Sequence, residues 1–261
     1  QEWDDKLHPI ACLHGNVGVI LFGLIQDEHD PVQPAPVLDK RLEDLWNAEL
    51  GFPSASIPTE DNLVAGVGNL IESVVRLNLR RNTRPEMSCM VNPDMRCFKV
   101  LEKNGVNWGF GDLAHGARQV AESWFQRLAT VAVVHGDMHL GNVVLREDRN
   151  AHLIDYAGSG PGHPAIDLVR FEMAILTGWV KQFLPESRCQ EFQACFTGNR
   201  ASYDRLAANF PELFSSILNR VCINGCVRAR DAAIQVVTAY GGSAKDYFAC
   251  KYLVAWQILL M

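Results

Sequence analysis

The stretch 133–172 constrains this chain more than any other, because short apolar runs alternate there with acidic and amide residues. Its pattern predicts a Gly-rich loop, a helix opened by Pro164 and, before them, three strands at 130–134, 142–145 and 152–154. Asp137, Asn142 and Asp155 fall where these strands meet loops. Oxygen ligands gathered around one point in this way suit a hard cation such as Mg²⁺.

The spacing of these polar residues is more informative than any one of them. Asn142 lies five residues after Asp137 and thirteen before Asp155, and Asp167 follows Asp155 by twelve. A His-Gly-Asp loop in this register, with an Ile-Asp pair ending a short hairpin, resembles the aminoglycoside phosphotransferase and choline kinase group of the protein-kinase-like fold. The related protein-kinase loop uses an Asp as base, an Asn on magnesium and a later metal-binding Asp.

The resemblance implies a role for each residue. Asp137 would orient an acceptor hydroxyl and take its proton. The Asn142 amide oxygen and the Asp155 carboxylate would bind Mg²⁺ and, through it, the phosphates of ATP, because Mg²⁺ usually takes only one or two ligands from the protein. His135 belongs to the catalytic loop with Asp137, and it would brace that loop from behind together with Asp167.

Three other interpretations of the same residues are open. Asp137 is also suited to cap a turn on a surface loop. His135 and His139 have the spacing of a helical zinc site, but Gly136, Gly141 and the flanking strands argue against a helix. The Asp-Met-His sequence at 137–139 resembles the first metal motif of metallophosphoesterases, whose Gly-Asn-His motif does not occur in this chain. His139 is expected to pack beside the loop or to line the acceptor site.

Composition narrows the class of partner. The 261 residues carry a net charge of −6, so there is no basic footprint for nucleic acid, and the acidic balance is compatible with a cationic substrate. The eight cysteines form no C-x-x-C pair, which predicts reduced thiols and a cytoplasmic location. The apolar run 17–25 is too short to cross a bilayer, so we expect no membrane partner.

The N-terminal segment predicts a strand pair at 8–14 and 17–25, joined by Gly15 and Asn16. By resemblance, residues 1–26 would be a remnant of the small N-terminal lobe, whose hinge includes Gly23 and Ile25 and meets the adenine of ATP. A hairpin packed on a helical domain is the alternative. No Gly-rich phosphate loop and no strand Lys with an acidic partner precede residue 27. We therefore expect the missing part of the lobe upstream in a longer chain, with possible partner domains; a degenerate relative is the alternative.

Residues 27–261 predict a mainly helical catalytic lobe around the small hairpin. The helical segments are 38–50, a helix capped by Thr59, 112–128, 164–185, 186–196, 203–209, 212–221, 227–240 and one starting at 243. The predicted fold class is thus α+β and protein-kinase-like. The predicted function is an ATP- and Mg²⁺-dependent phosphotransferase acting on a hydroxyl of a small molecule. The alternative is a kinase-like signalling or scaffold domain of a multidomain bacterial protein, with long helices that offer a protein surface.

Overall fold

A computed structural model describes residues 10–14, 17–21, 35–52, 58–80, 115–116, 119, 132–146, 149–180, 183–197 and 203–258. The predicted hinge residues Gly23 and Ile25 lie outside these ranges. Of the predicted helix 112–128, only residues 115, 116 and 119 are described, and these are helical. The described residues therefore include the predicted central hairpin and most of the predicted helical lobe.

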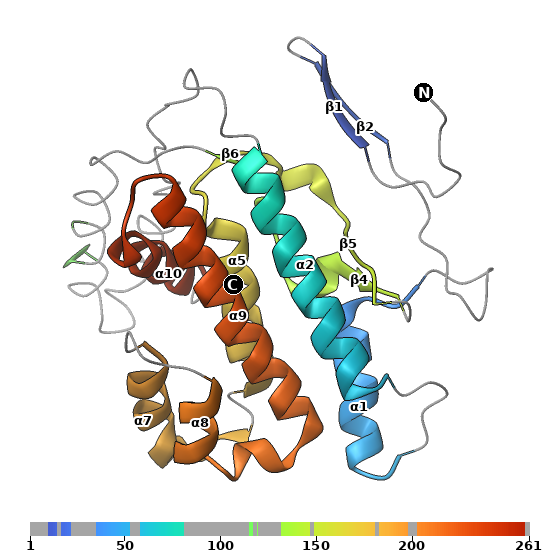
Figure 1. The fold of residues 1–261 in the computed structure, drawn as a ribbon, viewed down its shortest axis with the longest axis vertical. Helices are drawn as coiled ribbons and strands as arrows, with labels where there is room; N and C mark the ends of the chain where they lie inside the picture. Colours follow the sequence, from blue (N-terminus) through green and yellow to red (C-terminus); the bar gives the residue numbers. More distant parts are fainter. Residues whose placement is uncertain are drawn as a thin grey trace.

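Two long helices pack along each other through the middle of the molecule (Figure 1). The first, α2 (Glu60–Arg80), begins where the Thr59 hydroxyl accepts a hydrogen bond from the Asn62 amide at 3.3 Å, as the sequence predicts. The second is α9 (Ile217–Ala239). The apolar side chains of α2 at helical spacing are buried in the core: Leu63, Val67, Leu70 and Val74.

Helix α9 corrects the sequence prediction of two helices at 212–221 and 227–240. The Ser216 hydroxyl caps a single helix by accepting from the Asn219 amide at 3.2 Å, after a short 3₁₀ turn, η6 (Leu213–Ser215). Gly225 weakens the helical signal in the sequence. In the structure it lets neighbouring helices approach, since a Cβ there would lie 3.3 Å from Ile175 and from Val67.

The other helices surround α9 (Figure 1). They are α1 (Leu38–Glu49), α5 (Ile166–Ile175), α7 (Glu186–Thr197), α8 (Tyr203–Asn209) and α10 (Ala244–Ile258). Helix α5 was predicted to run from Pro164 to Pro185. It starts at Ile166 and passes at Leu176 into a π-helical segment, η5 (Leu176–Val180).

Three two-stranded antiparallel sheets complete the described structure. The pair β1 (Ile10–His14) and β2 (Val17–Leu21) confirms the predicted strand pair over the residues that are described there. The predicted central hairpin is formed by β4 (Val143–Leu145) and β5 (Ala151–Leu153). The third pair joins β3 (Ala132–Val134) to β6 (Gly160–Gly162).

Strand β6 lies in the stretch that was predicted to be a Gly-rich loop. Glycine and proline are poor strand formers, so the sequence gives no strand signal there. A Cβ on Gly162 would lie 2.5 Å from the Val134 side chain. The glycine therefore allows β6 to pack closely against β3, which leads into the catalytic loop.

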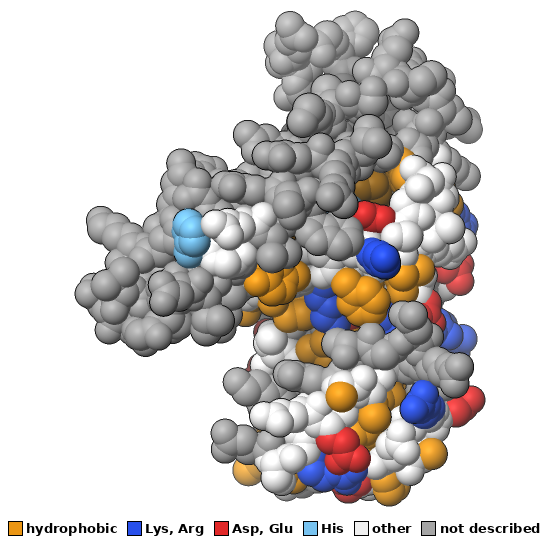
Figure 2. All heavy atoms as spheres, turned by 90° about the vertical axis from the view of Figure 1, so that its left-hand side faces the viewer, with side chains coloured by type: hydrophobic (Ala, Val, Ile, Leu, Met, Phe, Trp, Pro, Cys, Tyr) orange, Lys and Arg blue, Asp and Glu red, His pale blue; other side chains and the backbone are white. Residues whose placement is uncertain are grey.

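One hydrophobic cluster runs through the described helices and the hairpin, from Leu38 in α1 to Val254 in α10. The mainly helical architecture with a small hairpin confirms the predicted α+β fold class. The division into residues 1–26 and 27–261 remains a prediction. In the part of the chain that is described, no helix is both long and apolar enough to span a bilayer. On the face drawn in Figure 2, acidic and basic side chains are interspersed with hydrophobic ones.

Candidate active site

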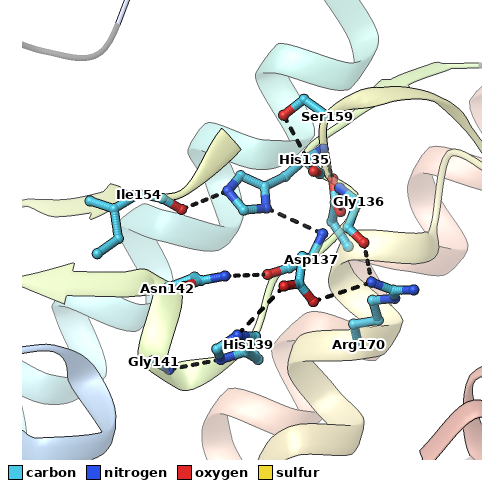
Figure 3. Close-up of polar contacts among 10 residues, drawn as sticks. His135, Gly136, Asp137, His139, Gly141, Asn142, Ile154, Ser159 and Arg170 are labelled. Atoms are coloured by element: carbon cyan, nitrogen blue, oxygen red, sulfur yellow. Dashed lines mark hydrogen bonds and ion pairs between the residues drawn. The ribbon is translucent and has the colours of Figure 1, made fainter. Parts of the chain in front are cut away.

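Three of the predicted site residues, His135, Asp137 and Asn142, lie together where β3 ends and the loop 135–139 begins (Figure 3). The loop leads into a 3₁₀ turn, η3 (Leu140–Asn142), and then into β4. The Ile154 amide donates to the Asn142 carbonyl at 2.9 Å, which extends the pairing of β4 and β5 by one step. Because Asp155 is the next residue, this bond brings it close to Asn142.

Asp167 holds the start of the catalytic loop. One carboxylate oxygen accepts from the His135 amide at 2.7 Å and the other from the Gly136 amide at 2.8 Å. Burial raises the pKa of Asp167, while the two amide hydrogen bonds and the charge of Arg170 oppose that shift. Gly136 has φ 82°, a conformation that favours glycine. Asp167 thus occupies the bracing position that the resemblance implies.

His135 joins the loop to the hairpin through its ring. Its Nε2 lies 2.8 Å from the Ile154 carbonyl, which can only accept, so Nε2 carries the proton. Its Nδ1 then accepts from the Asp137 amide at 3.3 Å. The Tyr156 ring packs edge-on against it at 4.7 Å between centroids. These contacts hold the ring between the loop and the hairpin and fix the backbone of Asp137.

The side chain of Asp137 is 53% exposed and faces two possible donors (Figure 3). The Arg170 Nη1 lies 3.4 Å from Oδ1 and also donates to the Gly136 carbonyl. The His139 Nε2 lies 3.7 Å from Oδ2. His139 Nδ1 accepts from the Gly141 amide, so its Nε2 presents a proton to the carboxylate. His139, not Asp137, is the cap of η3.

Arg170 was missed in the sequence. Its only signal is its position three residues after Asp167, which places both side chains on one side of a helix. That signal becomes useful only once α5 is known to lie beside the catalytic loop. Arg170 can then be recognised as the cation that joins the loop backbone to the carboxylate of Asp137.

Asn142 and Asp155 offer the oxygen atoms for a cation. The buried Asn142 amide donates through Nδ2 to the Asp137 carbonyl at 2.9 Å, so Oδ1 is the amide atom suited to a metal. Asp155 is exposed and adopts a left-handed conformation, with φ 59°, which Asp tolerates better than most residues. Its Oδ1 also accepts from the Ala157 amide at 3.4 Å.

This donor set fits Mg²⁺, which prefers oxygen and keeps phosphate or water among its ligands. Among the described residues, no group of three or more His, Cys, Asp or Glu could hold a metal ion. Among these residues, His135 and His139 therefore do not belong to a cluster that could form a zinc site. A cation at Asn142 and Asp155 would take phosphate oxygens or water for the rest of its coordination.

Residues 57–206 match the sequence profile of the phosphotransferase enzyme family. This match covers more than half of the chain. The chain belongs to the phosphotransferase enzyme family. Membership confirms the resemblance that the central motif indicates, and the matched range contains the whole catalytic loop, the hairpin and α5.

Solved structures of small-molecule kinases resemble this phosphotransferase family member at low identity. A glucosamine kinase in complex with glucosamine, ADP and inorganic phosphate is 12% identical, with a TM-score of 0.48, over 96% of this chain and 60% of its own. The aminoglycoside phosphotransferase APH(3'')-Id from Streptomyces rimosus is 20% identical, with a TM-score of 0.33, over 62% of this chain and 63% of its own. An ethanolamine kinase from Plasmodium vivax is 9% identical, with a TM-score of 0.28, over 96% of this chain and 68% of its own.

The chain thus spans about 60% of the length of the glucosamine kinase. A search of curated proteins gives no significant match. The family assignment rests on the match over 57–206.

Proposed function

We propose that this chain supplies the catalytic lobe of a phosphotransferase that moves the γ-phosphoryl group of ATP to a hydroxyl of a small molecule. One observation carries the proposal: an exposed carboxylate, Asp137, stands on a braced loop whose next turn holds Asn142, and the Asn142 carbonyl accepts from the amide of Ile154, the residue before Asp155. Family membership supports phosphoryl transfer as the reaction.

Asp137 has the chemistry that an acceptor hydroxyl requires. A carboxylate within hydrogen-bond reach orients the hydroxyl in line with the phosphoryl group and takes its proton late in the transfer. Arg170 and His139 lie beside the two carboxylate oxygens, with Nη1 of Arg170 3.4 Å from Oδ1 and Nε2 of His139 3.7 Å from Oδ2. His135 is proposed to act with Asp137 by holding its backbone.

Asn142 and Asp155 are the residues proposed to hold Mg²⁺ with the ATP phosphates. When bound, the metal would neutralise charge on the transferring phosphoryl group. The predicted hinge contact of Gly23 and Ile25 with adenine lies outside the described residues and remains part of the proposal. The net charge of −6 is compatible with a cationic acceptor.

A cytoplasmic location is also proposed. Five cysteines among the described residues are free thiols, which is the usual state in a reducing compartment: Cys189, Cys195, Cys222, Cys226 and Cys250.

The substitution Asp137→Asn in the full-length protein tests the proposal. It preserves shape and removes the proton acceptor, so we expect kcat to fall by about 10²–10⁴-fold with little change in Mg·ATP affinity or melting temperature. Glu72→Gln is a matched control, because Glu72 is an exposed carboxylate in an ion pair with Arg76 on α2. Equal activity and equal stability of Asp137→Asn and wild type would contradict the proposal and favour a scaffold role.

A further inference from the structure

A second group of buried polar side chains lies on the far side of α5 from the catalytic loop. Glu172 is 0% exposed, and its Oε2 accepts from the Tyr247 hydroxyl at 2.6 Å. The Lys251 ammonium donates to Oε1. Tyr247 and Lys251 are one turn apart on α10, so Glu172 ties α5 to one face of α10.

The cluster reaches two more helices. The Lys251 ammonium lies 4.9 Å above the ring of Phe196 in α7, and the Phe196 carbonyl accepts from Arg230 in α9 at 3.0 Å. The Cys226 thiol of α9 donates to the Glu172 carbonyl at 3.7 Å. Glu172 is therefore joined by hydrogen bonds to α9 and α10, which both pack against α5 (Figure 1).

Burial of the Glu172 carboxylate costs desolvation free energy. Burial raises the pKa of Glu172, and the charge and hydrogen bond of Lys251 and the hydrogen bond of Tyr247 oppose this by stabilising the ionised form. A buried ion pair is a poor source of net stability, because an apolar replacement of the same volume is often as stable. Its directional bonds do, however, fix one rotation of the helix that carries it.

That rotation matters because α5 also carries the groups that hold the catalytic loop. At 3.6 residues per turn, Glu172 points about 140° away from Asp167 and about 160° away from Arg170. A side-chain atom lies roughly 6 Å from the helix axis, so turning α5 by about 10° would move the Asp167 carboxylate by about 1 Å. A displacement of about 1 Å in a catalytic group can cost on the order of 10²-fold in rate.

We propose that the buried Glu172–Tyr247–Lys251 cluster sets the rotation of α5 and thereby positions Asp137 through Asp167 and Arg170. Glu172 is a positioning residue and does not touch the acceptor. The inference rests on the proposed function, since it concerns the geometry of the same reaction. It makes the activity depend on residues outside the loop that carries Asp137.

The test replaces both charges so that no buried ion is left without a partner. Glu172→Gln with Lys251→Met keeps the side-chain sizes and removes the ion pair. The matched control is Glu60→Gln with Arg220→Met, which removes the ion pair between α2 and α9, where Glu60 and Arg220 make two hydrogen bonds. Both double variants are made in the full-length protein. Each is assayed at the same number of degrees below its own melting temperature.

Two readouts follow the position of the loop. Hydrogen exchange of the His135 and Gly136 amides reports their bonds to Asp167 without any activity measurement. We call the Glu172→Gln, Lys251→Met double variant the α5 variant. We expect hydrogen exchange at these two amides to rise about tenfold in the α5 variant and to stay unchanged in the control. We expect kcat to fall at least about tenfold with a smaller change in Mg·ATP affinity, because the residues proposed to hold Mg²⁺, Asn142 and Asp155, lie at the open end of the β4–β5 hairpin and not on α5.

Unchanged exchange at both amides in a folded α5 variant would overturn the inference, as would equal effects in the control. If that variant does not fold, Tyr247→Phe removes one bond to Glu172 without unpairing a charge. Tyr247→Phe should raise exchange at the His135 and Gly136 amides. It should not raise exchange at the Ile154 amide, which donates to the Asn142 carbonyl and is the internal control. An equal rise at all three amides would overturn the inference. A failure of the proposed function can be distinguished from a failure of this inference. If the proposed function is wrong, the wild type shows no phosphotransfer, and the exchange measurement still tests whether the cluster positions the loop.

Discussion

The conformation of Asp155 decides how its role can be tested. A left-handed backbone conformation costs about 1–2 kcal/mol for most residues, whereas Asn and Asp adopt it more readily. An Ala substitution therefore changes both the carboxylate and the backbone strain. An Asn substitution changes mainly the charge.

We predict that Asp155→Asn lowers Mg·ATP affinity at least about tenfold while the free energy of unfolding stays within about 0.5 kcal/mol of wild type. Asp155→Ala should lose the same affinity and about 1 kcal/mol of stability as well. Calorimetric titration with Mg·ATP and urea unfolding measure the two quantities in the full-length protein. Wild-type affinity in both variants would show that Asp155 does not bind the metal.

The sequence predicts the identity of the polar site residues better than their contacts. The spacing of Asp137, Asn142 and Asp155 follows from the hairpin, so it can be read without coordinates. The proton position on His135 depends on the carbonyl of Ile154, which is 19 residues away. Such a long-range contact leaves no local pattern in the sequence.

At the scale of the helix, two glycines in α2 lie next to side chains that differ in their freedom to move. A Cβ on Gly66 would lie 2.2 Å from the side chain of Leu145, which is buried in the core. A Cβ on Gly68 would lie 2.1 Å from the guanidinium of Arg228, the end of an exposed and flexible side chain. The first neighbour has little room to move and the second can turn into solvent.

We predict opposite signs for the two Ala substitutions. Gly66→Ala should lower the free energy of unfolding by about 1–2 kcal/mol, because overpacking outweighs the gain in helix propensity. Gly68→Ala should raise it by up to about 1 kcal/mol. Each variant is the control for the other in urea unfolding. A stabilising Gly66→Ala would mean that Leu145 repacks freely.

The ion pair between α2 and α9 gives a pH dependence with a defined sign. The hydrogen bond from Arg220 lowers the pKa of Glu60 below its ordinary value of 4.5. A depressed carboxylate pKa adds stability above the unfolded-state pKa, and this stability is lost as the pH falls through the folded-state pKa. Both side chains are about a third exposed, so we expect only about 0.5–1 kcal/mol.

We predict that Glu60→Gln is less stable than wild type by about that amount at pH 7, and that the difference disappears as the pH falls below about 4.5. Urea unfolding across this range measures the difference. Glu72→Gln is the control, because the Glu72–Arg76 pair is exposed on both sides and should contribute less. A constant difference from pH 7 to pH 3 would contradict the linkage.

Element boundaries were predictable where a local capping residue marks them. Thr59 marks the start of α2, and the Ser243 amide donates to Asp246 at 2.6 Å at the start of α10. They were not predictable where tertiary contacts overrule propensity. Gly225 lies within one continuous helix, and Gly162 belongs to a strand, because neighbouring side chains need the space that glycine leaves.

At the scale of the whole molecule, the described helices share one core. The hydrophobic cluster includes Leu38 of α1, Leu63 of α2, Phe171 of α5, Ile223 of α9 and Tyr247 of α10. Polar contacts cross between distant helices as well, since Glu49 of α1 accepts from the Leu218 amide at the start of α9 at 3.0 Å. Helices far apart in the sequence therefore hold the lobe together.

We predict that the helical lobe unfolds as one cooperative unit. Since one core joins α2 to α10, loss of either helix would expose apolar surface on the helices that remain. Gly66→Ala in α2 and Tyr247→Phe in α10 should each shift the same urea midpoint, and far-UV circular dichroism and tryptophan fluorescence should report that shift equally. Native-state hydrogen exchange extends the test, because the most protected amides of α2, α5, α9 and α10 should then share one opening free energy. If Tyr247→Phe lowered protection in α10 and α5 but left α2 unchanged, the lobe would contain two units, with the catalytic loop held by the less stable one.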